Sequence, residues 1–369
     1  MELLRKLEDV FYRIASFLKR ERLLSILILV YVALLFFDSS LIRRTPKLID
    51  YESIATILSF LIVSRGLEIS GFFSKVAGKV VEFSRGSEFR LLVILIAVVT
   101  LSSTVIMNDN AIFVFIPLIL TISSVADIEL SKAVSLVAIA ANVGSSLTPF
   151  GNPQNIIIWR KYDVPALEFV VSMFPFVLAW TTLNLAFAWK CARGCINVSE
   201  FPSVSVNKRL VMLSITLFVL NVLLVEINLP FLAFLITFVT YSTLSRETIL
   251  SIDLAIVAVF ALIFVDFGEI SRLISPHIGV AGSNFEIVLL SALLSQAISN
   301  VPATVLLSSR CPWLPLAIGV NLGGTGFVIG SLANLIAVRM SKISLKDFHR
   351  YSIPYFLAAT AVTLIILIA

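Results

Sequence analysis

The sequence predicts an all-α integral membrane protein with two inverted-topology repeats, each containing a re-entrant hairpin and a broken transmembrane helix. Three observations predict this fold. The 369-residue chain is 59% hydrophobic, 14% charged and has a mean hydropathy of +1.02, more apolar surface than a soluble domain of this size can bury. Segments 139–160 and 318–339 share seven of 22 residues, including glycines and asparagines that a membrane helix rarely carries. Lysines and arginines gather at the ends of apolar segments, where they orient membrane helices.

The chain is expected to have four parts. Residues 1–22 place apolar side chains at helical spacing on one face and charged ones on the other, which predicts an amphipathic helix in the membrane interface. No small-residue cleavage site follows it, so it does not resemble a cleaved signal. Residues 23–189 form the first transmembrane repeat and 190–208 a cytoplasmic linker. Residues 209–369 form an extra crossing and the second, inverted repeat.

Two apolar stretches, 89–127 and 286–309, each carry a polar interruption at the middle and are predicted to be re-entrant hairpins. The predicted spanning segments are 23–38, 48–66, 131–160, 165–189, 209–227, 229–244, 252–270, 312–340 and 350–369.

The distribution of basic residues predicts a cytoplasmic N-terminus. With that orientation 21 of the 28 lysines and arginines lie inside, as the positive-inside rule requires. The extra crossing 209–227 then makes each segment of the second half run opposite to its partner in the first. Glu68 and Glu269 repeat within similar tetrapeptides near segment ends, where a surface position is expected for both.

The two similar segments are expected to break as helices near their centres. Gly144, Pro149, Gly151 and Pro153 interrupt the first, which frees carbonyls on one half-helix and N–H groups on the other. Carbonyl and asparagine oxygens suit a desolvated cation, whereas the N-terminal end of a half-helix suits an anion. The second copy has three glycines and a threonine between 323 and 326, and no proline. The alternative is that these glycines only allow close helix packing.

The hairpin interruptions carry the most polar residues of the apolar segments. Asp109, within Asn108-Asp109-Asn110, is expected to bind a cation or carry a proton, since a carboxylate at the bilayer centre costs about 2.5–3.5 kcal/mol. If 89–106 and 111–127 are two full crossings, Asp109 is instead a loop carboxylate at the surface. Ser299-Asn300-Val301-Pro302 is the counterpart, for which a helix cap is the alternative.

Other functional classes lack their sequence signals. The basic residues serve topology, so no nucleic-acid partner is expected, and Cys191, Cys195 and Cys311 are expected to be free thiols. No phosphate-binding loop and no hydrolase or metalloprotease motif is present, so neither an enzyme nor a bound cofactor is predicted. An intramembrane enzyme and a channel remain alternatives.

Asn142-Val143-Gly144-Ser145-Ser146-Leu147-Thr148-Pro149-Phe150-Gly151-Asn152-Pro153-Gln154-Asn155 resembles the signature of the ion-transporter superfamily. That superfamily includes divalent-anion/sodium symporters, arsenite permeases and a group of sodium/proton antiporters. The resemblance covers essentially the whole chain. It implies a substrate held between two Ser-Asn-Thr-like hairpin tips, with sodium sites beside them.

The hairpin tips depart from this pattern. In the first tip Met107 occupies the position of the family's serine and Asp109 that of its threonine. In the second tip Val301 occupies the position of the threonine. A dicarboxylate would lose two hydroxyl donors and meet a carboxylate, so the Asn-Asp pair is closer to the arsenite-permease and antiporter branch. The resemblance also raises two partners, a second copy of the chain and a partner ATPase, which the residues themselves do not indicate.

These observations predict a multi-pass secondary transporter of a prokaryotic cytoplasmic membrane that works by an elevator-like motion. It would carry a small inorganic or organic anion, or oxyanion, coupled to sodium or protons. The alternative is a sodium/proton antiporter with Asp109 as the titrating group. The expected substrate-binding residues are Asn108, Asp109, Asn110, Thr148, Asn300, Val301, Pro302 and Thr325. The expected cation-binding residues, with sodium as the metal ion, are Asn108, Asp109, Gly144, Ser145, Asn155, Ser299, Asn300, Gly323, Thr325 and Asn334.

Overall fold

The structure is a computed structural model that describes residues 22–368, except 105, 150, 193, 197–204, 253–254, 275–281 and 309. Every regular element in these ranges is helical. The predicted interfacial helix 1–22 lies outside the described residues apart from its last residue, and part of the predicted linker 190–208 is outside them as well.

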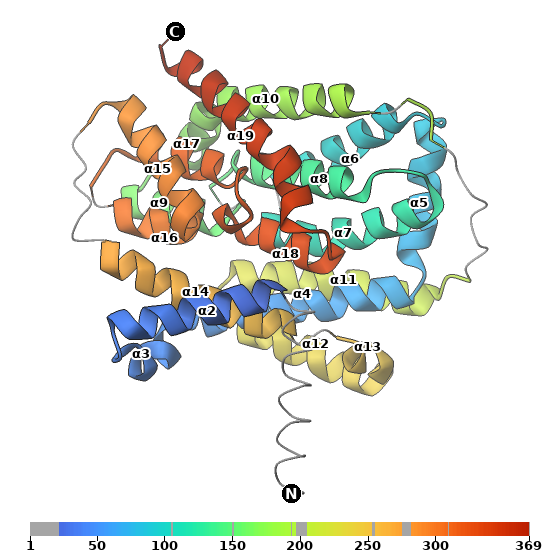
Figure 1. Cartoon of the computed structure of the whole chain (residues 1–369). Helices are drawn as coiled ribbons and strands as arrows, with labels where there is room; N and C mark the ends of the chain where they lie inside the picture. Colours follow the sequence, from blue (N-terminus) through green and yellow to red (C-terminus); the bar gives the residue numbers. More distant parts are fainter. Residues whose placement is uncertain are drawn as a thin grey trace, which may run out of the picture.

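The helices form two layers (Figure 1). The lower layer in Figure 1 packs the following helices: α2 (Arg22–Phe37), α3 (Leu41–Leu48), α4 (Tyr51–Ile69), α11 (Lys208–Glu226), α12 (Pro230–Leu244), α13 (Arg246–Leu250) and α14 (Ala255–Ile274). The upper layer contains α6 (Glu88–Ser103), α7 (Asn108–Val125), α8 (Leu130–Ser145), α9 (Pro153–Tyr162), α10 (Ala166–Cys191), α15 (Asn284–Ile298), α16 (Asn300–Leu307), α17 (Trp313–Gly323), the 3-10 turn η2 (Val328–Gly330), α18 (Leu332–Ser341) and α19 (Leu345–Ile368). Segments distant in sequence thus share each layer.

The predicted spanning segments correspond to helices of this fold. Among the described residues, α7, α10, α11 and α19 are long and apolar enough to cross a bilayer, and α4 with α5 (Phe72–Ser84) adds a fifth candidate if the bent pair is one span. The two predicted broken helices appear as α8 followed by α9, and as α17 followed by η2 and α18. An all-helical integral membrane protein is therefore confirmed as the fold class.

Each predicted hairpin is a pair of helices with its polar interruption between them. The first consists of α6 and α7, which begins at Asn108; the second consists of α15 and α16, which begins at Asn300. Both interruptions lie inside the molecule, where Asn108 and Asn300 are 1% and 2% exposed. The alternative, in which Asp109 is a loop carboxylate at the membrane surface, thus finds no support here, although α7 alone is long enough to span a membrane.

Two helices stand where the sequence suggested only connections. Helix α5 follows α4 after a bend of 72°, at Gly71, whose φ of 78° is accessible to glycine. Helix α3 fills the connection between α2 and α4, with its charged residues on one side and Leu41 buried. Short amphipathic helices like these were missed because their apolar positions are too few to stand out beside the long apolar runs.

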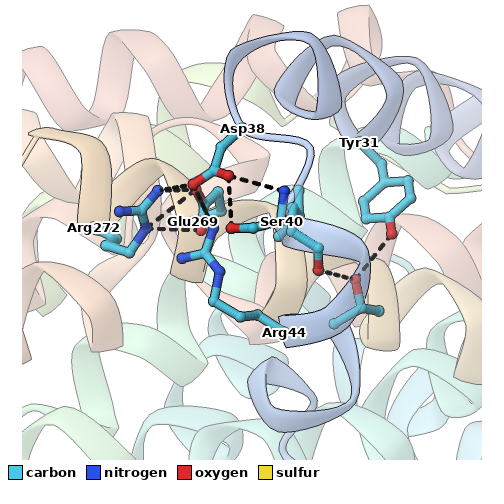
Figure 2. A network of polar contacts seen from close by, with 8 residues as sticks. Tyr31, Asp38, Ser40, Arg44, Glu269 and Arg272 are labelled. Atoms are coloured by element: carbon cyan, nitrogen blue, oxygen red, sulfur yellow. Dashed lines mark hydrogen bonds and ion pairs between the residues drawn. The ribbon is translucent and has the colours of Figure 1, made fainter.

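The prediction of a surface position is wrong for Glu269. Its side chain is fully buried between the guanidinium groups of Arg44 and Arg272, with nitrogen–oxygen distances of 3.2 and 2.6 Å. Asp38, after α2, accepts from both arginines as well, which joins α2 and α3 to α14 (Figure 2). Burial is possible because this ion-pair network satisfies the carboxylate. Glu68, the matching residue, is half exposed, and its one ion pair among the described residues is with Arg65.

Candidate functional site

The two broken helices cross at the centre of the upper layer and are locked by reciprocal amide hydrogen bonds. Asn142, near the end of α8, donates to the side-chain oxygen of Asn334 in α18 over 2.9 Å. Asn321, near the end of α17, donates to the side-chain oxygen of Asn155 in α9 over 2.7 Å. All four residues are at most 3% exposed. Since 142 corresponds to 321 and 155 to 334 in the repeated segments, these bonds are equivalent contacts made in both directions.

The same asparagines close the breaks in their own segments. The amide of Asn155 donates to the carbonyls of Ser145, Ser146 and Thr148, at 2.9–3.4 Å. The amide of Asn334 donates to the carbonyls of Gly324 and Phe327, the positions equivalent to Ser145 and Thr148. Carbonyls freed by a helix break must find donors when buried, and here one amide supplies several.

The first hairpin tip is bonded directly to this crossing. The side-chain amide of Asn108 donates to the side-chain oxygen of Asn142 over 2.9 Å, and its backbone N–H donates to the carbonyl of Gly151. Its own side-chain oxygen accepts from the backbone N–H of Asp109. Two hydrogen bonds therefore hold the tip against the first broken helix.

The second tip carries backbone strain. Ser299 joins α15 to α16 with φ 72° and ψ 156°, a conformation that is nearly confined to glycine and costs a non-glycine residue about 1–3 kcal/mol. The next residue, Asn300, accepts from the backbone N–H of Val301 as Asn108 does from Asp109. Strain of this kind persists only where the surroundings impose it, and it occurs often at ligand-binding sites.

Close packing supports both breaks from outside. A side chain at Gly144 would collide with the backbone carbonyl of Thr100 in α6, and one at Gly323 with Ser295 in α15. The glycines therefore do allow close helix packing, as the alternative interpretation proposed, in addition to lying at a break. Gln296 of α15 bridges the second break, because its amide donates to the Gly323 carbonyl and its oxygen accepts from the Phe327 N–H.

A cavity of about 320 Å³ lies between the two layers, beside the crossing. The upper layer contributes both hairpin tips and the first residues of α9 and α18. The lower layer contributes the start of α4, the α11–α12 connection and the apolar face of α14 around Phe264. Three carboxylates line it, Asp50, Glu52 and Asp109, and no lysine or arginine of the described residues does.

Asp109 is the one carboxylate of the cavity that lies at a tip. Its Oδ1 atom is buried and forms no hydrogen bond among the described residues. Asp50, by contrast, caps α4 by accepting from the backbone N–H of Ser53 at 3.0 Å. A buried carboxylate oxygen without a donor is less stable as an anion than a solvated one. Within the described ranges no three His, Cys, Asp or Glu side chains converge into a metal site.

The structure separates the predicted site residues into two groups. The group that lines the cavity comprises Asn108, Asp109, Asn110, Ser299, Asn300, Val301 and Pro302. The group that holds the breaks together, away from the cavity wall, comprises Gly144, Ser145, Thr148, Asn155, Gly323, Thr325 and Asn334.

Two cavity residues that donate to the crossing were missed in the sequence. Ser331 donates to the side-chain oxygen of Asn142 over 2.7 Å, and Gln154 donates to that of Asn321 over 3.3 Å. Each joins the cavity wall to the crossing. Ser331 could have been found from the repeat, because it occupies the position equivalent to Asn152, which also donates to Asn321. Gln154 follows the break motif directly but has no polar equivalent in the second segment.

Comparisons with known proteins agree with this architecture. The model of the citrate transporter family (CitMHS) matches residues 17–312. The inner membrane protein YbiR of Escherichia coli K12 is 33% identical over 361 residues, 95% of this chain and 96% of its own. The uncharacterized transporter MJ0456 of Methanocaldococcus jannaschii is 31% identical over 300 residues, 80% of this chain and 82% of its own. A silicon efflux transporter of rice, LSI3, is 28% identical over 147 residues, 38% of this chain and 30% of its own.

The resemblance to ion transporters is thereby confirmed, and so is the prediction that the chain is no enzyme. The match to an inner membrane protein over nearly its whole length agrees with a multi-pass membrane location. The chain belongs to the citrate transporter family within the ion-transporter superfamily and is a secondary transporter of the membrane.

Proposed function

We propose that this transporter moves a small inorganic or organic anion together with sodium ions or protons that bind at Asp109. The observation that carries the proposal is the charge of the cavity: it is lined by three carboxylates and by no lysine or arginine of the described chain. A bare anion about 6 Å from an ionised Asp109 would be repelled by about 3 kcal/mol at an effective dielectric constant of 20. A cation or proton at Asp109 removes this repulsion, which couples the two ligands.

The polar groups around the cavity suit such a pair of ligands. The free Oδ1 of Asp109 accepts a proton or coordinates sodium, together with the neighbouring side-chain oxygen of Asn110. The anion would then meet the amide groups of Asn110, Gln154 and Asn300, and the N-terminal ends of α7 and α16, which favour negative charge.

The two-layer arrangement supports an elevator-like motion. Both tips and the crossing belong to the upper layer, while the opposite cavity wall, around Phe264 and Phe267, belongs to the lower layer. The equivalent hydrogen bonds of the crossing support two inverted repeats, since Asn142 and Asn321 play the same part for opposite halves. In the proposed cycle the upper layer moves as a unit past the lower one and carries both ligands.

The test is uptake into proteoliposomes. Radiolabelled citrate, arsenite, sulfate and phosphate are offered separately, with an inward sodium gradient, with an inward proton gradient, and with neither. We expect gradient-dependent accumulation of one of these anions by the wild type, and loss of that dependence in Asp109→Asn, which removes the charge at the tip.

The matched control is Asp163→Asn, which also removes one carboxylate. Asp163 is exposed and ends α9 with φ 51°, a conformation that asparagine adopts readily, so its transport should be unchanged. Wild-type ion dependence in Asp109→Asn would contradict the proposal.

A sodium/proton antiporter is the second candidate, favoured by the same absence of basic side chains from the described cavity lining. In that case Asp109 binds sodium and protons in alternation, and no anion is carried. Proteoliposomes loaded with a pH-sensitive dye distinguish the two candidates. Proton release on addition of sodium, without uptake of any anion, would establish the antiporter, and Asp109→Asn would abolish it.

A further inference from the structure

A second hollow, about 480 Å³, lies between α5 and the first half of α11, on a different part of the molecule from the transport cavity. Its floor is apolar, formed by Phe72 and Val76 of α5 and by Met212 and Ile215 of α11. Both helices hold fixed positions here: the backbone N–H of Asn207, which caps α11, donates to the carbonyl of Ser70 at the α4–α5 bend, over 3.0 Å.

The rim of this hollow is strongly basic. Lys75 and Lys79 extend from α5, and Lys208 from the start of α11. No carboxylate lines the hollow, and none of the three lysines forms an ion pair within the described part of the chain. Three uncompensated ammonium groups above an apolar floor favour a ligand with an anionic end and an apolar end.

A third, smaller hollow of about 140 Å³ continues from the floor. The two hollows share Phe72 and Ile215, and the smaller one is lined almost entirely by apolar side chains, including Leu67, Ile106, Ala111 and Phe218. It reaches between α4 and α11 of the lower layer and the α6–α7 connection of the upper layer. Its wall includes residues that precede and follow Asn108 in the sequence, so this hollow lies between the two layers, next to the first hairpin tip.

The hollow lies at one end of the helix bundle, beside an amphipathic helix. Helix α5 turns 72° away from α4 and crosses the end of the helix bundle, where α10 ends and α11 begins (Figure 1). Its sequence is amphipathic, with Phe73, Ala77 and Val81 buried and Lys75 and Lys79 exposed. An amphipathic helix in this position is typical of a membrane interface, so the rim of the hollow would face lipid headgroups and its apolar floor the acyl chains.

We infer that this pair of hollows binds one anionic phospholipid of the bilayer. Lys75, Lys79 and Lys208 hold the phosphate of its headgroup, and the hollow shared by Phe72 and Ile215 takes part of an acyl chain. Because the acyl chain enters the contact between the upper and lower layers, the lipid touches both parts that must move past one another during transport. The site is independent of the substrate cavity and of what the transporter carries.

The experiment measures lipid retention rather than transport. The full chain is reconstituted in nanodiscs of equal phosphatidylglycerol and phosphatidylcholine, and the lipids that stay bound are identified by native mass spectrometry. We expect the wild type to retain one phosphatidylglycerol. The triple variant Lys75→Gln/Lys79→Gln/Lys208→Gln should weaken the binding of phosphatidylglycerol about a hundredfold, because each lysine near an anionic lipid contributes a factor of about five.

Two matched controls make the result specific. Lys190→Gln/Lys342→Gln/Lys346→Gln removes equal charge from exposed lysines elsewhere and should retain the lipid. Ile215→Trp fills the shared part of the hollows and should release it, whereas Val219→Trp, one turn further on the same exposed face of α11, should not.

Several outcomes would overturn the inference. Equal retention of phosphatidylglycerol in the two triple variants would exclude a headgroup site at these lysines. Retention in Ile215→Trp equal to that in Val219→Trp would exclude the acyl-chain position. Displacement of the lipid by glycerol phosphate at millimolar concentration would show that the hollow recognises a soluble phosphate instead.

Discussion

The two halves of the crossing reach the same geometry by different means. In the first break the chain itself supplies the interruption: Pro149 lies within it, and Pro153 is the first residue of α9. The second break has no proline. It has a short 3-10 turn held by its neighbours, since Gln296 bridges the Gly323 carbonyl and the Phe327 N–H, and His349 accepts from the N–H of Val328. The two halves therefore share the pattern of asparagines, but they bend the backbone by different means: prolines in the first break and contacts from neighbouring side chains in the second.

The tips differ more than the breaks, and the difference is one of charge. At the first tip Asn108 is followed by Asp109, whose Oδ1 has no donor in the described structure. At the second tip Asn300 is followed by Val301, and strain is stored at Ser299 instead. The two repeats are therefore related in fold but contribute different charges to the cavity. Such an asymmetry is expected if the first tip binds the coupling ion and the rest of the cavity binds the substrate.

The largest effect should come from the crossing itself. Asn142→Ala removes one hydrogen-bond partner from each of the buried side chains of Asn108, Ser331 and Asn334, and we expect it to lower the free energy of unfolding by about 2–4 kcal/mol. Because the side-chain amide of Asn108 then has no acceptor at residue 142, coupled uptake should fall on the order of tenfold, which corresponds to about 1.4 kcal/mol of positioning. Tryptophan fluorescence during thermal unfolding and uptake in proteoliposomes measure the two effects.

The equivalent substitution in the other half is the control. Asn321→Ala removes one hydrogen-bond partner from each of Asn152, Gln154 and Asn155 but from no residue of a hairpin tip. It should therefore destabilise the protein to a similar extent and affect the ion dependence of uptake less. If both variants lose coupling equally, the tip is not positioned through Asn142.

The next largest effect should distinguish the two ways of bending the backbone. Gln296→Leu removes the side chain that bridges the second break. Because the Gly323 carbonyl and the Phe327 N–H lose their partner, the free energy of unfolding should fall by about 1–3 kcal/mol. Pro153→Ala in the first break should cost only about 0.4–1 kcal/mol, because a proline at the first helical position acts chiefly on the unfolded chain. Thermal unfolding of the two variants in the same detergent compares them; a larger loss for Pro153→Ala would reverse the comparison.

The sequence predicts the common features of the halves well because glycine, proline and asparagine leave strong local signals in apolar segments. The all-helical membrane fold, the position of both breaks and the polar tips at Asn108 and Asn300 follow from such signals. The partners of these residues do not. That Asn142 bonds across to Asn334, and that Thr148 bonds to the carbonyl of Thr104 rather than lining the cavity, depends on how the helices cross, which no local pattern encodes.

The burial of Glu269 was missed for a related reason. Its two arginine partners lie on different elements: Arg272 is one turn away on α14, but Arg44 belongs to α3, more than two hundred residues earlier. Charge beside the end of an apolar segment ordinarily indicates a surface position. Only the packing of α3 on α14 converts this glutamate into the centre of an ion-pair network (Figure 2).

The smallest of the expected effects tests that difference between two repeated glutamates. Glu269→Gln removes the negative charge between Arg44 and Arg272 and leaves Asp38 as their only carboxylate partner among the described residues. We expect the apparent Tm to fall by a few degrees. Glu68→Gln breaks one exposed pair with Arg65, and its Tm should stay within error of the wild type, since surface ion pairs contribute little. Thermal unfolding at low and high salt measures both, and the loss in Glu269→Gln should persist at high salt because its partners are screened only weakly. An equal response of the two variants would mean that the buried network stabilises the lower layer no more than a surface pair does.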